Sequence, residues 1–384
     1  MVESQPLSRA DTPTGDDALL QAWAERIRAA AAGGPRLRIR GGGSKAFYGN
    51  PLDAECEVLD TRAYAGIVNH EPTELVVTAR CGTPLAELEA ALARHGQCLP
   101  FEPPHFGPSA TVGGMVATGL AGPARAAVGA VRDYVLGVRL LDGRGEDLHF
   151  GGQVMKNVAG YDVSRALAGS LGTLGVITEV SLKVLPVAAG EATLCAALPA
   201  DAALERLAHW RSQPLPLNAS LWSPHAGGTL WLRLRGAAAA VEAASERLLR
   251  ETGGQRLEPA AAATVWHSVR EQTSDFFAQP PSDEHGLWRL SVAPTTPMLA
   301  WPGDTVIEWF GGQRWVWAPV SAAEALCALA RQGGGHATLF RPPAAQPEAH
   351  ERFTPPEATL RTLQQRVRAA FDPHGVFQPG IWGY

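Results

Sequence analysis

The sequence is poor in charged residues and lacks the features of several protein classes. Charged residues make up 18% of the 384 residues and hydrophobic residues 46%. This is too apolar a composition for wholesale disorder. No run of Lys and Arg is long enough to follow a phosphate backbone, and the net charge is −5. We therefore expect no binding to DNA or RNA.

Signals for membrane insertion, secretion and metal clusters are missing as well. No stretch approaches the ~18 apolar residues of a membrane span, and residues 1–17 do not resemble a signal peptide. We expect a cytoplasmic protein without direct membrane insertion. Neither a disulfide framework nor an iron–sulfur cluster is predicted, because the five cysteines are scattered and none lies in a C-x-x-C pair. The spacing of His and acidic residues predicts no metal site.

What the sequence does contain divides it into two differently built parts. Of 41 glycines, 26 precede residue 191, whereas ten of the 11 tryptophans follow it. We predict a first domain over residues 1–188 and a second over 189–345. A C-terminal helix and tail over 346–384 is expected to return toward the first domain.

The first part alternates short strands with glycine-rich turns. Periodicity predicts helices over 18–32 and 84–95, strands over 36–40, 55–60, 75–78 and 176–184, and a hairpin of 135–141 with 146–150. The second part has the ferredoxin-like order of strand, helix, strand, strand, helix, strand over 191–258, and a looser second copy over 287–341. The fold class is therefore α+β, and we expect the second domain to be one antiparallel sheet with helices on one face, built from a duplicated unit. A last helix is predicted over 357–371.

Three glycine-rich segments are candidates for binding chemistry. The first, Arg40–Lys45 (RGGGSK), follows a strand, and its glycines let backbone amides approach a diphosphate. A hairpin tip is an equally open interpretation. The second, Pro104–Gly119, has small residues on which a planar cofactor could lie, and a buried glycine-rich turn is the alternative. The third, Gly169–Thr178, leads into a strand. The preceding segment, Lys156–Asp162, contains a cation, an amide and an acid that could bind a ligand. The alternative is the start of a helix with Asp162 as its N-cap.

Together these segments resemble the FAD-binding domain of the vanillyl-alcohol oxidase / p-cresol methylhydroxylase (PCMH-type) flavoprotein superfamily. In that superfamily an RGGG-like loop, a P-S-A-T-V-G-G segment and a G-S-x-G-T-L-G-V-I-T segment surround FAD. Within it, residues 154–162, 334–341 and 371–380 are most similar to the E-subunit family of bacterial glycolate oxidase (glycolate dehydrogenase). The resemblance implies a PCMH-type FAD-binding domain of two α/β subdomains, followed by the antiparallel cap domain.

The resemblance also implies the residues that hold FAD. The first loop would cradle the pyrophosphate, the second segment would line the flavin, and the third would complete the pocket. Noncovalent FAD is implied, because Ser44 and Lys45 stand where covalent members often carry a histidine. The implied FAD-binding residues are Ile39, Arg40, Gly41, Gly42, Gly43, Ser44, Lys45, Pro108, Ser109, Ala110, Thr111, Val112, Gly113, Gly114, Thr118, Gly119, Gly122, Leu171, Gly172, Thr173, Leu174, Gly175, Val176 and Ile177.

The catalytic residues are not identified by the sequence. Oxidation of a hydroxy acid on a flavin needs a base and a cation for the carboxylate. Candidates in the second domain are Arg289, Arg314, His336 and Arg341, each of which can equally be a surface or core residue. Catalytic relatives carry a C-terminal H-x-G-D-G-N-x-H cluster, which this sequence lacks.

The resemblance therefore implies an FAD-binding subunit of a glycolate-oxidising complex, in an electron-relay or supporting role. Its implied partners are a D-type flavin subunit and an F-type iron–sulfur subunit, through which the chain would lie at the inner face of the membrane. Two alternatives stay open. One is a self-sufficient FAD oxidoreductase on a hydroxy acid or aldonolactone, and the other is a catalytically silent assembly subunit with a vestigial FAD pocket.

Overall fold

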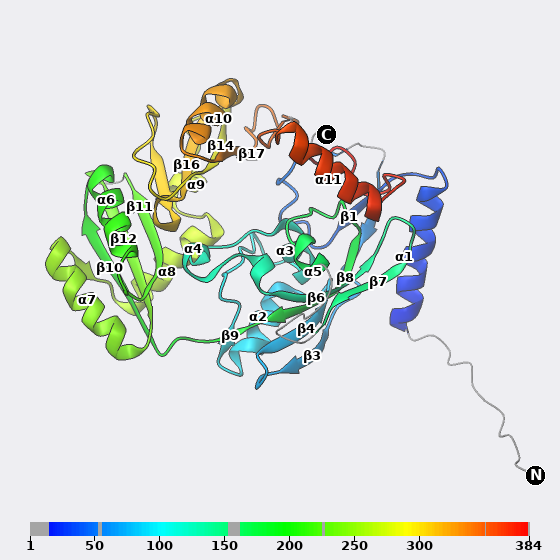
Figure 1. Ribbon diagram of the computed structural model, residues 1–384, viewed down its shortest axis with the longest axis horizontal. Coiled ribbons are helices and arrows are strands. Elements are labelled where there is room, and N and C mark those ends of the chain that lie inside the picture. Colours follow the sequence, from blue (N-terminus) through cyan, green and yellow to red (C-terminus); the bar gives the residue numbers. More distant parts are fainter. Residues whose placement is uncertain (1–14, 53–55, 153–161, 225–226, 350, 383–384) are drawn as a thin grey trace, which may run out of the picture.

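The computed structural model of the chain describes residues 15–52, 56–152, 162–224, 227–349 and 351–382. Figure 1 shows two lobes. The first part of the chain and its C-terminal segment form one lobe, and the strands and helices between residues 190 and 341 form the other. We call the first lobe the first domain and the second the cap domain.

A five-stranded antiparallel sheet forms the centre of the first domain. Its strands are β3 (Ile67–Glu71), β4 (Val76–Arg80), β6 (Val135–Leu141), β7 (Asp147–Gly151) and β8 (Val176–Lys183), in the order β3-β4-β8-β6-β7. Helices α2 (Leu85–Ala93) and α3 (Val112–Thr118) pack on this sheet, and Leu88 and Met115 are fully buried there. Shorter elements are β5 (Gln97–Cys98), β9 (Leu185–Pro186), α4 (Arg125–Val128), α5 (Val163–Ala166) and the 3₁₀ turn η1 (Val131–Asp133).

A second, smaller part of the first domain contains both ends of the described chain. Strands β1 (Leu37–Arg40) and β2 (Glu57–Asp60) pair in parallel, and helix α1 (Gly15–Ala31) packs beside them. The other edge of β1 pairs with the tail, where Leu37 donates to the carbonyl of Val376 at 2.8 Å and accepts from Gln378 at 3.1 Å. Helix α11 (Ala358–Phe371) precedes this tail and lies over the first domain (Figure 1).

The cap domain contains one antiparallel sheet of eight strands. They are β10 (Gly190–Ala197), β11 (Leu217–Ser223), β12 (Thr229–Gly236), β13 (Gln255–Arg256), β14 (His285–Ser291), β15 (Thr305–Glu308), β16 (Gln313–Pro319) and β17 (His336–Arg341). The order is β13-β10-β12-β11-β15-β16-β14-β17, so each half repeats the same arrangement and β11 and β15 join the halves. The α+β class and the duplicated ferredoxin-like unit are confirmed. The second copy has no helix between its first two strands, where residues 292–304 are irregular.

Helices cover both faces of the cap sheet, which corrects the expectation of helices on one face. Helices α6 (Ala200–Arg211), α7 (Ala238–Thr252) and α10 (Ala323–Gln332) pack on one face. Helices α8 (Pro259–Glu271) and α9 (Asp275–Ala278), absent from the sequence prediction, pack on the other. Trp266 of α8 donates to the buried Thr193 hydroxyl on β10 at 2.8 Å. This second face also contacts Phe47, Phe106 and Leu120 of the first domain, so the sheet is buried on both sides.

Candidate functional site

A cavity of about 490 Å³ opens where β1 ends. The first domain supplies most of its wall, and residues 342–352 and the tail supply the rest. We call it the loop cavity. It is lined by Arg38, Ile39, Arg40, Gly41, Gly42, Gly43, Ser44, Lys45, Ala46, Phe47, Tyr48, Asn50, Pro51, Leu52, Thr111, Gly114, Ala117, Thr118, Leu171, Pro342, Pro347, Glu348, Arg352, Gln378 and Ile381.

The glycines of the first loop are required by close packing. A Cβ on Gly41 would lie 2.3 Å from the Thr111 hydroxyl, and a Cβ on Gly42 would lie 1.4 Å from the Ser109 carbonyl oxygen. Gly43 has a φ of +73°, which glycine adopts without strain. The alternative of a hairpin tip is wrong, because β1 and β2 run in parallel. The amides of residues 42–45 donate to no carbonyl of the described residues, so they can serve a bound anion.

The second glycine-rich segment forms a helix that the sequence did not indicate. Thr111 caps α3, and its hydroxyl accepts from the amide of Gly114. Burial of Met115 and Val116 offsets the weak helix preference of Gly113 and Gly114. The helix ends at Gly119, whose φ is +61°. This arrangement brings Gly114 and Thr118 to the wall of the loop cavity.

The predicted FAD-binding residues fall into two groups. All seven residues from Ile39 to Lys45, together with Thr111, Gly114, Thr118 and Leu171, line the loop cavity. The others lie next to it or beneath it. Gly119 and Gly122 border neighbouring cavities, Pro108 borders a third, and Ser109 binds the Gly42 carbonyl. Buried or closely packed beneath the wall are Ala110, Val112, Gly113, Gly172, Thr173, Leu174, Gly175, Val176 and Ile177.

Arg352 and Gln378 are among the wall residues that sequence reasoning missed. Arg352 donates to the carbonyls of Phe47 at 2.7 Å and Gly49 at 2.8 Å, and it thereby fixes the segment after the glycine loop. Gln378 donates to the Ile39 carbonyl at 3.2 Å, while its Oε1 is buried without a hydrogen-bond partner among the described residues. A buried acceptor without a donor is costly, so this oxygen indicates a missing ligand group. The similarity of residues 371–380 to a known family was the sequence signal that could have pointed to Gln378.

The loop cavity fits a dinucleotide cofactor on these observations. Free amides at the glycine loop suit a diphosphate, and the Gln378 oxygen suits an N–H or O–H donor. Of the segment Lys156–Asp162, residues 156–161 lie outside the described residues. Asp162 itself caps α5 by accepting from the amide of Arg165 at 3.4 Å, as the helix-entry interpretation predicts.

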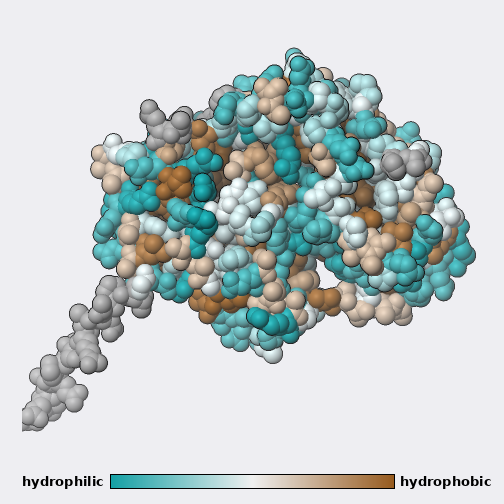
Figure 2. Space-filling view, turned by 180° about the vertical axis from the view of Figure 1, so that it is seen from behind, coloured by the Kyte–Doolittle hydropathy of each residue, from teal (hydrophilic) through white to brown (hydrophobic). Residues whose placement is uncertain are grey.

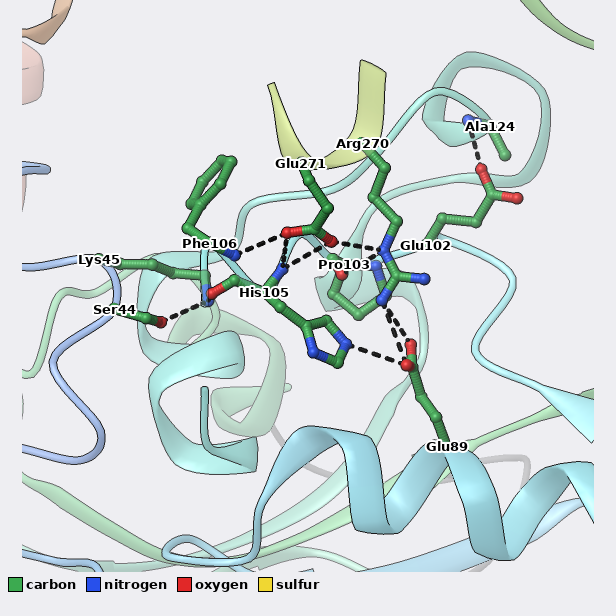
Figure 3. Close-up of polar contacts among 10 residues, drawn as sticks. All are labelled: Ser44, Lys45, Glu89, Glu102, Pro103, His105, Phe106, Ala124, Arg270 and Glu271. Atoms are coloured by element: carbon green, nitrogen blue, oxygen red, sulfur yellow. Dashed lines mark hydrogen bonds and ion pairs between the residues drawn. The ribbon is translucent and has the colours of Figure 1, made fainter. Parts of the chain in front are cut away.

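A polar network joins the glycine loop to the cap domain (Figure 3). The carboxylate of Glu271, at the end of α8, accepts from the amides of His105 at 3.1 Å and Phe106 at 2.8 Å. Its neighbour Arg270 donates to the Pro103 carbonyl and to Glu89 on α2. Lys45 donates to the His105 carbonyl at 3.2 Å. The loop at residues 103–106 therefore connects Lys45 to helix α8.

Burial changes the acid strength of groups in this network. Burial lowers the pKa of Lys45 to about 8, although Glu271 acts in the opposite direction. Burial alone would raise the pKa of Glu89, but the hydrogen bond from His105 and the charge of Arg270 hold it below its usual range. Glu89 is consequently a carboxylate at neutral pH, and Lys45 is close to its titration point.

The four catalytic candidates lie in different surroundings. Arg314 is fully buried and donates to three backbone carbonyls in residues 296–311, so it holds a loop and is not free for a substrate. Arg341 donates a hydrogen bond to Oε1 of Gln272. Its guanidinium carbon lies 4.1 Å from the ring centroid of Phe47. Arg289 and His336 line a second cavity of about 470 Å³ between the two domains. We call it the arginine cavity.

Among the described residues, no three His, Cys, Asp or Glu side chains are grouped so that they could hold a metal ion. No helix in the described ranges is both long and apolar enough to cross a membrane. Seen from behind, hydrophilic residues cover much of both lobes and hydrophobic residues form small separate groups (Figure 2).

Comparison with known proteins gives consistent results at three levels. A family described as an FAD binding domain matches residues 20–151. The glycolate oxidase subunit GlcE of Escherichia coli K12 is 44% identical over 360 residues, which are 94% of this chain and 96% of the relative. A D-lactate dehydrogenase of Archaeoglobus fulgidus is 36% identical over 38% of this chain and 33% of its own. A solved alkyldihydroxyacetonephosphate synthase superposes with a TM-score of 0.66 at 15% identity, over 93% of this chain and 74% of that one, and it shares the fold.

Proposed function

Since the chain belongs to the family of the glycolate oxidase subunit GlcE, among the PCMH-type FAD-binding flavoproteins, we propose that it is the FAD-binding subunit of a glycolate-oxidising complex. The single observation that carries the proposal is the loop cavity. There the free amides of a glycine loop and the unpartnered Gln378 oxygen meet at one wall.

The chain's own residues define how the cofactor is held. The amides of residues 42–45 bind the diphosphate, and the Thr111 region fixes the loop by contact with Gly41 and Gly42. Lys45 supplies positive charge when it is protonated. When bound, FAD supplies the acceptor for a hydride or for electrons. The proposed attachment is noncovalent, because Ser44 and Lys45 occupy the positions at which covalent members of the superfamily often carry a histidine.

We propose an electron-relay or supporting role within the complex. The sequence supports this role because it lacks the H-x-G-D-G-N-x-H cluster of catalytic relatives, and its scattered cysteines do not suit an iron–sulfur cluster. The partners would be a D-type flavin subunit and an F-type iron–sulfur subunit. A glycolate oxidase subunit GlcD of Bacillus subtilis is 32% identical over 34% of this chain, which supports a common origin of the FAD-binding domains.

A second candidate function is favoured by the arginine cavity. A cation-lined cavity next to residues 118–121 suits an anionic substrate, as required if the chain itself oxidises a hydroxy acid. The third possibility, a silent assembly subunit with a vestigial pocket, predicts a colourless protein that FAD cannot reconstitute.

The absorption spectrum of the purified chain tests the proposal first. We expect a yellow protein that releases its flavin on acid precipitation. A protein that neither contains nor takes up FAD overturns the proposed function, and colour that stays in the acid pellet overturns noncovalent attachment.

Assays of dye reduction with glycolate then separate the two active roles. The relay role predicts activity only after D-type and F-type subunits are added. Glycolate-dependent dye reduction by the single chain supports the self-sufficient enzyme instead.

A further inference from the structure

Three arginines from separate segments line the arginine cavity. Arg125 comes from α4 in the first domain, Arg211 from the end of α6, and Arg289 from β14. His336 completes the basic side, and the cavity wall contains no Asp or Glu among the described residues. In the described part of the chain, no ion pair joins any of these arginines to a carboxylate. Arg125 and Arg289 are partly buried and Arg211 is exposed. The carboxylates that interact electrostatically with them, Asp133 with Arg125 and Glu308 with Arg289, do not line the cavity, so its wall is cationic.

The arginines are held in place by aromatic rings. The guanidinium carbon of Arg125 lies 4.6 Å from the Trp309 ring centroid, and that of Arg211 lies 5.8 Å from the Phe310 ring centroid. Arg289 donates one hydrogen bond to the Tyr48 hydroxyl at 2.9 Å. Its Nε is buried and has no hydrogen-bond partner among the described residues. Arg289 therefore retains an unused donor, which is the state expected of a residue that awaits an acceptor.

The turn that carries the two aromatic rings is strained. Trp309 and Phe310 both have a φ near +55°, a conformation that bulky residues rarely adopt. The Trp309 indole donates to the Gly122 carbonyl at 3.1 Å, and the Phe310 amide donates to the Ser220 hydroxyl at 2.7 Å. The first bond holds the strained turn against the first domain, and the second holds it against β11 of the cap sheet. The consequence is that Arg125 and Arg211 are positioned on the same cavity.

The arginine cavity adjoins the loop cavity, because Tyr48 and Thr118 line both. We propose that Arg125, Arg211 and Arg289 form a binding site for a small carboxylate next to the cofactor. Guanidinium groups bind carboxylates through charge-assisted, often bidentate hydrogen bonds. The ligand would satisfy the free donor of Arg289 and relieve the repulsion between Arg289 and Arg125.

The electrostatics of the cavity agree with this site. Partial burial and the neighbouring guanidiniums of Arg289 and Arg132 lower the pKa of Arg125. Burial and Arg289 likewise lower the pKa of His336, so the imidazole is neutral at pH 7 and can accept or donate a hydrogen bond. The assignment of the acid as a 2-hydroxy acid such as glycolate rests on the proposed function. The carboxylate site itself rests only on the side chains of this chain.

Titration of the purified full-length chain with oxalate and glycolate tests the inference, with heat or tryptophan fluorescence as readout. Flavin content is measured first, and both FAD-loaded and FAD-free chain are titrated. We expect saturable binding of both acids and no binding of the neutral analogue glycolamide. Arg125→Met and Arg211→Met should each weaken binding roughly 10- to 100-fold, the usual effect of losing a hydrogen bond to a charged group. Circular dichroism checks that both variants fold.

Arg250→Met is the matched control, because Arg250 is 73% exposed on α7 and far from the cavity in sequence. It should bind oxalate as the wild type does. Absence of oxalate binding by both forms of the folded chain overturns the inference, as does equal competition by chloride or glycolamide. If the chain cannot take up FAD but still binds oxalate through Arg125 and Arg211, the proposed function is refuted and the carboxylate site is retained.

Discussion

Arg270 of the cap domain donates to the carboxylate of Glu89 in the FAD-binding domain at 2.9 Å, and this ion pair spans the junction between the two domains. Both side chains are largely buried, and Glu89 also accepts from the His105 imidazole at 2.9 Å. The pair therefore belongs to the network that reaches Lys45 at the glycine loop. This network is a chain of contacts from the cap domain to the glycine loop.

Replacement of Arg270 should weaken the contact between the domains. Arg270→Met leaves the Glu89 carboxylate partly buried with one partner fewer, and we expect a loss of about 1–2 kcal/mol in the free energy of unfolding. Urea unfolding measures this loss. Arg250→Met, which removes an exposed and distant ion pair of 4.0 Å, should change stability by less than about 0.5 kcal/mol. Equal effects of the two variants would contradict the role given to the Arg270–Glu89 pair.

The stability of the chain should depend on the protonation of Glu308. Burial raises the pKa of this carboxyl from 4.5 to about 7, against hydrogen bonds from Trp315 and Gln313. The folded state thus keeps a proton that the unfolded state releases above pH 4.5. The resulting stabilisation is complete below pH 4.5 and is lost as the pH rises through 7.

Glu308→Gln should remove this dependence. We expect the variant to be more stable than the wild type at pH 8, by on the order of 2–3 kcal/mol, and the difference to vanish toward pH 4.5. Thermal unfolding at a series of pH values measures it. The exposed Glu205→Gln on α6 is the control and should leave the pH profile unchanged. A Glu308→Gln profile parallel to that of the wild type would show that Glu308 does not titrate in this range.

The affinity for FAD should fall as the pH rises through 8. Lys45 is buried at the loop cavity with its pKa lowered to about 8, and a bound diphosphate would favour the charged ammonium. We expect the Kd for FAD to increase roughly three- to tenfold between pH 7 and 9. Fluorescence titration of the FAD-free chain measures it. Lys45→Met should bind more weakly at pH 7 and show no such trend, whereas Lys183→Met, outside the cavity, should behave as the wild type.

Two glycines of the cavity should respond differently to substitution. Gly42→Ala places a Cβ 1.4 Å from the Ser109 carbonyl oxygen, so the loop must move, and both stability and FAD content should fall. A Cβ at Gly114 meets only the Thr111 hydroxyl oxygen, at 3.2 Å, and Gly114 lines the loop cavity, so we expect the side chain of Gly114→Leu to occupy cavity space. It should reduce FAD content while the Tm stays within a few degrees. Flavin absorbance measures the FAD content of both variants and thermal unfolding measures their stability. Equal losses of stability in the two variants would contradict this prediction.

Local patterns in the sequence were sufficient for most of the fold. The hairpin of β6 and β7 and both cap repeats were predicted because periodicity and turn residues are local signals. Helix α3 was missed because Gly113 and Gly114 oppose helix formation in isolation, and only the Thr111 cap and burial of Met115 overcome this. Helix α8 was missed because it belongs to neither repeat.

The glycine loop of the candidate site was predicted, but its distant partners were not. Gln378 and Arg352 reach the loop cavity through tertiary packing, and no local pattern marks them as wall residues. The same holds for Arg211, which meets Arg289 through the packing of the cap domain, and for Arg125, which meets both only when the two domains pack together. Apart from the family resemblance of residues 371–380, which include Gln378, the sequence contains no signal for these contacts. The free donor of Arg289 and the free acceptor of Gln378 became visible only in the folded chain.

The pairing of β1 with the tail has a consequence for synthesis on the ribosome. Leu37 is translated long before Val376 and Gln378, its partners at the outer edge of β1. Until residues 376–378 are translated, the nascent chain carries an unpaired strand edge and a loop cavity without its Gln378 wall. The first domain is therefore completed only after the cap domain. A polypeptide that ends at a stop codon between residues 342 and 372 would contain both cap repeats but lack the Gln378 part of the cavity wall.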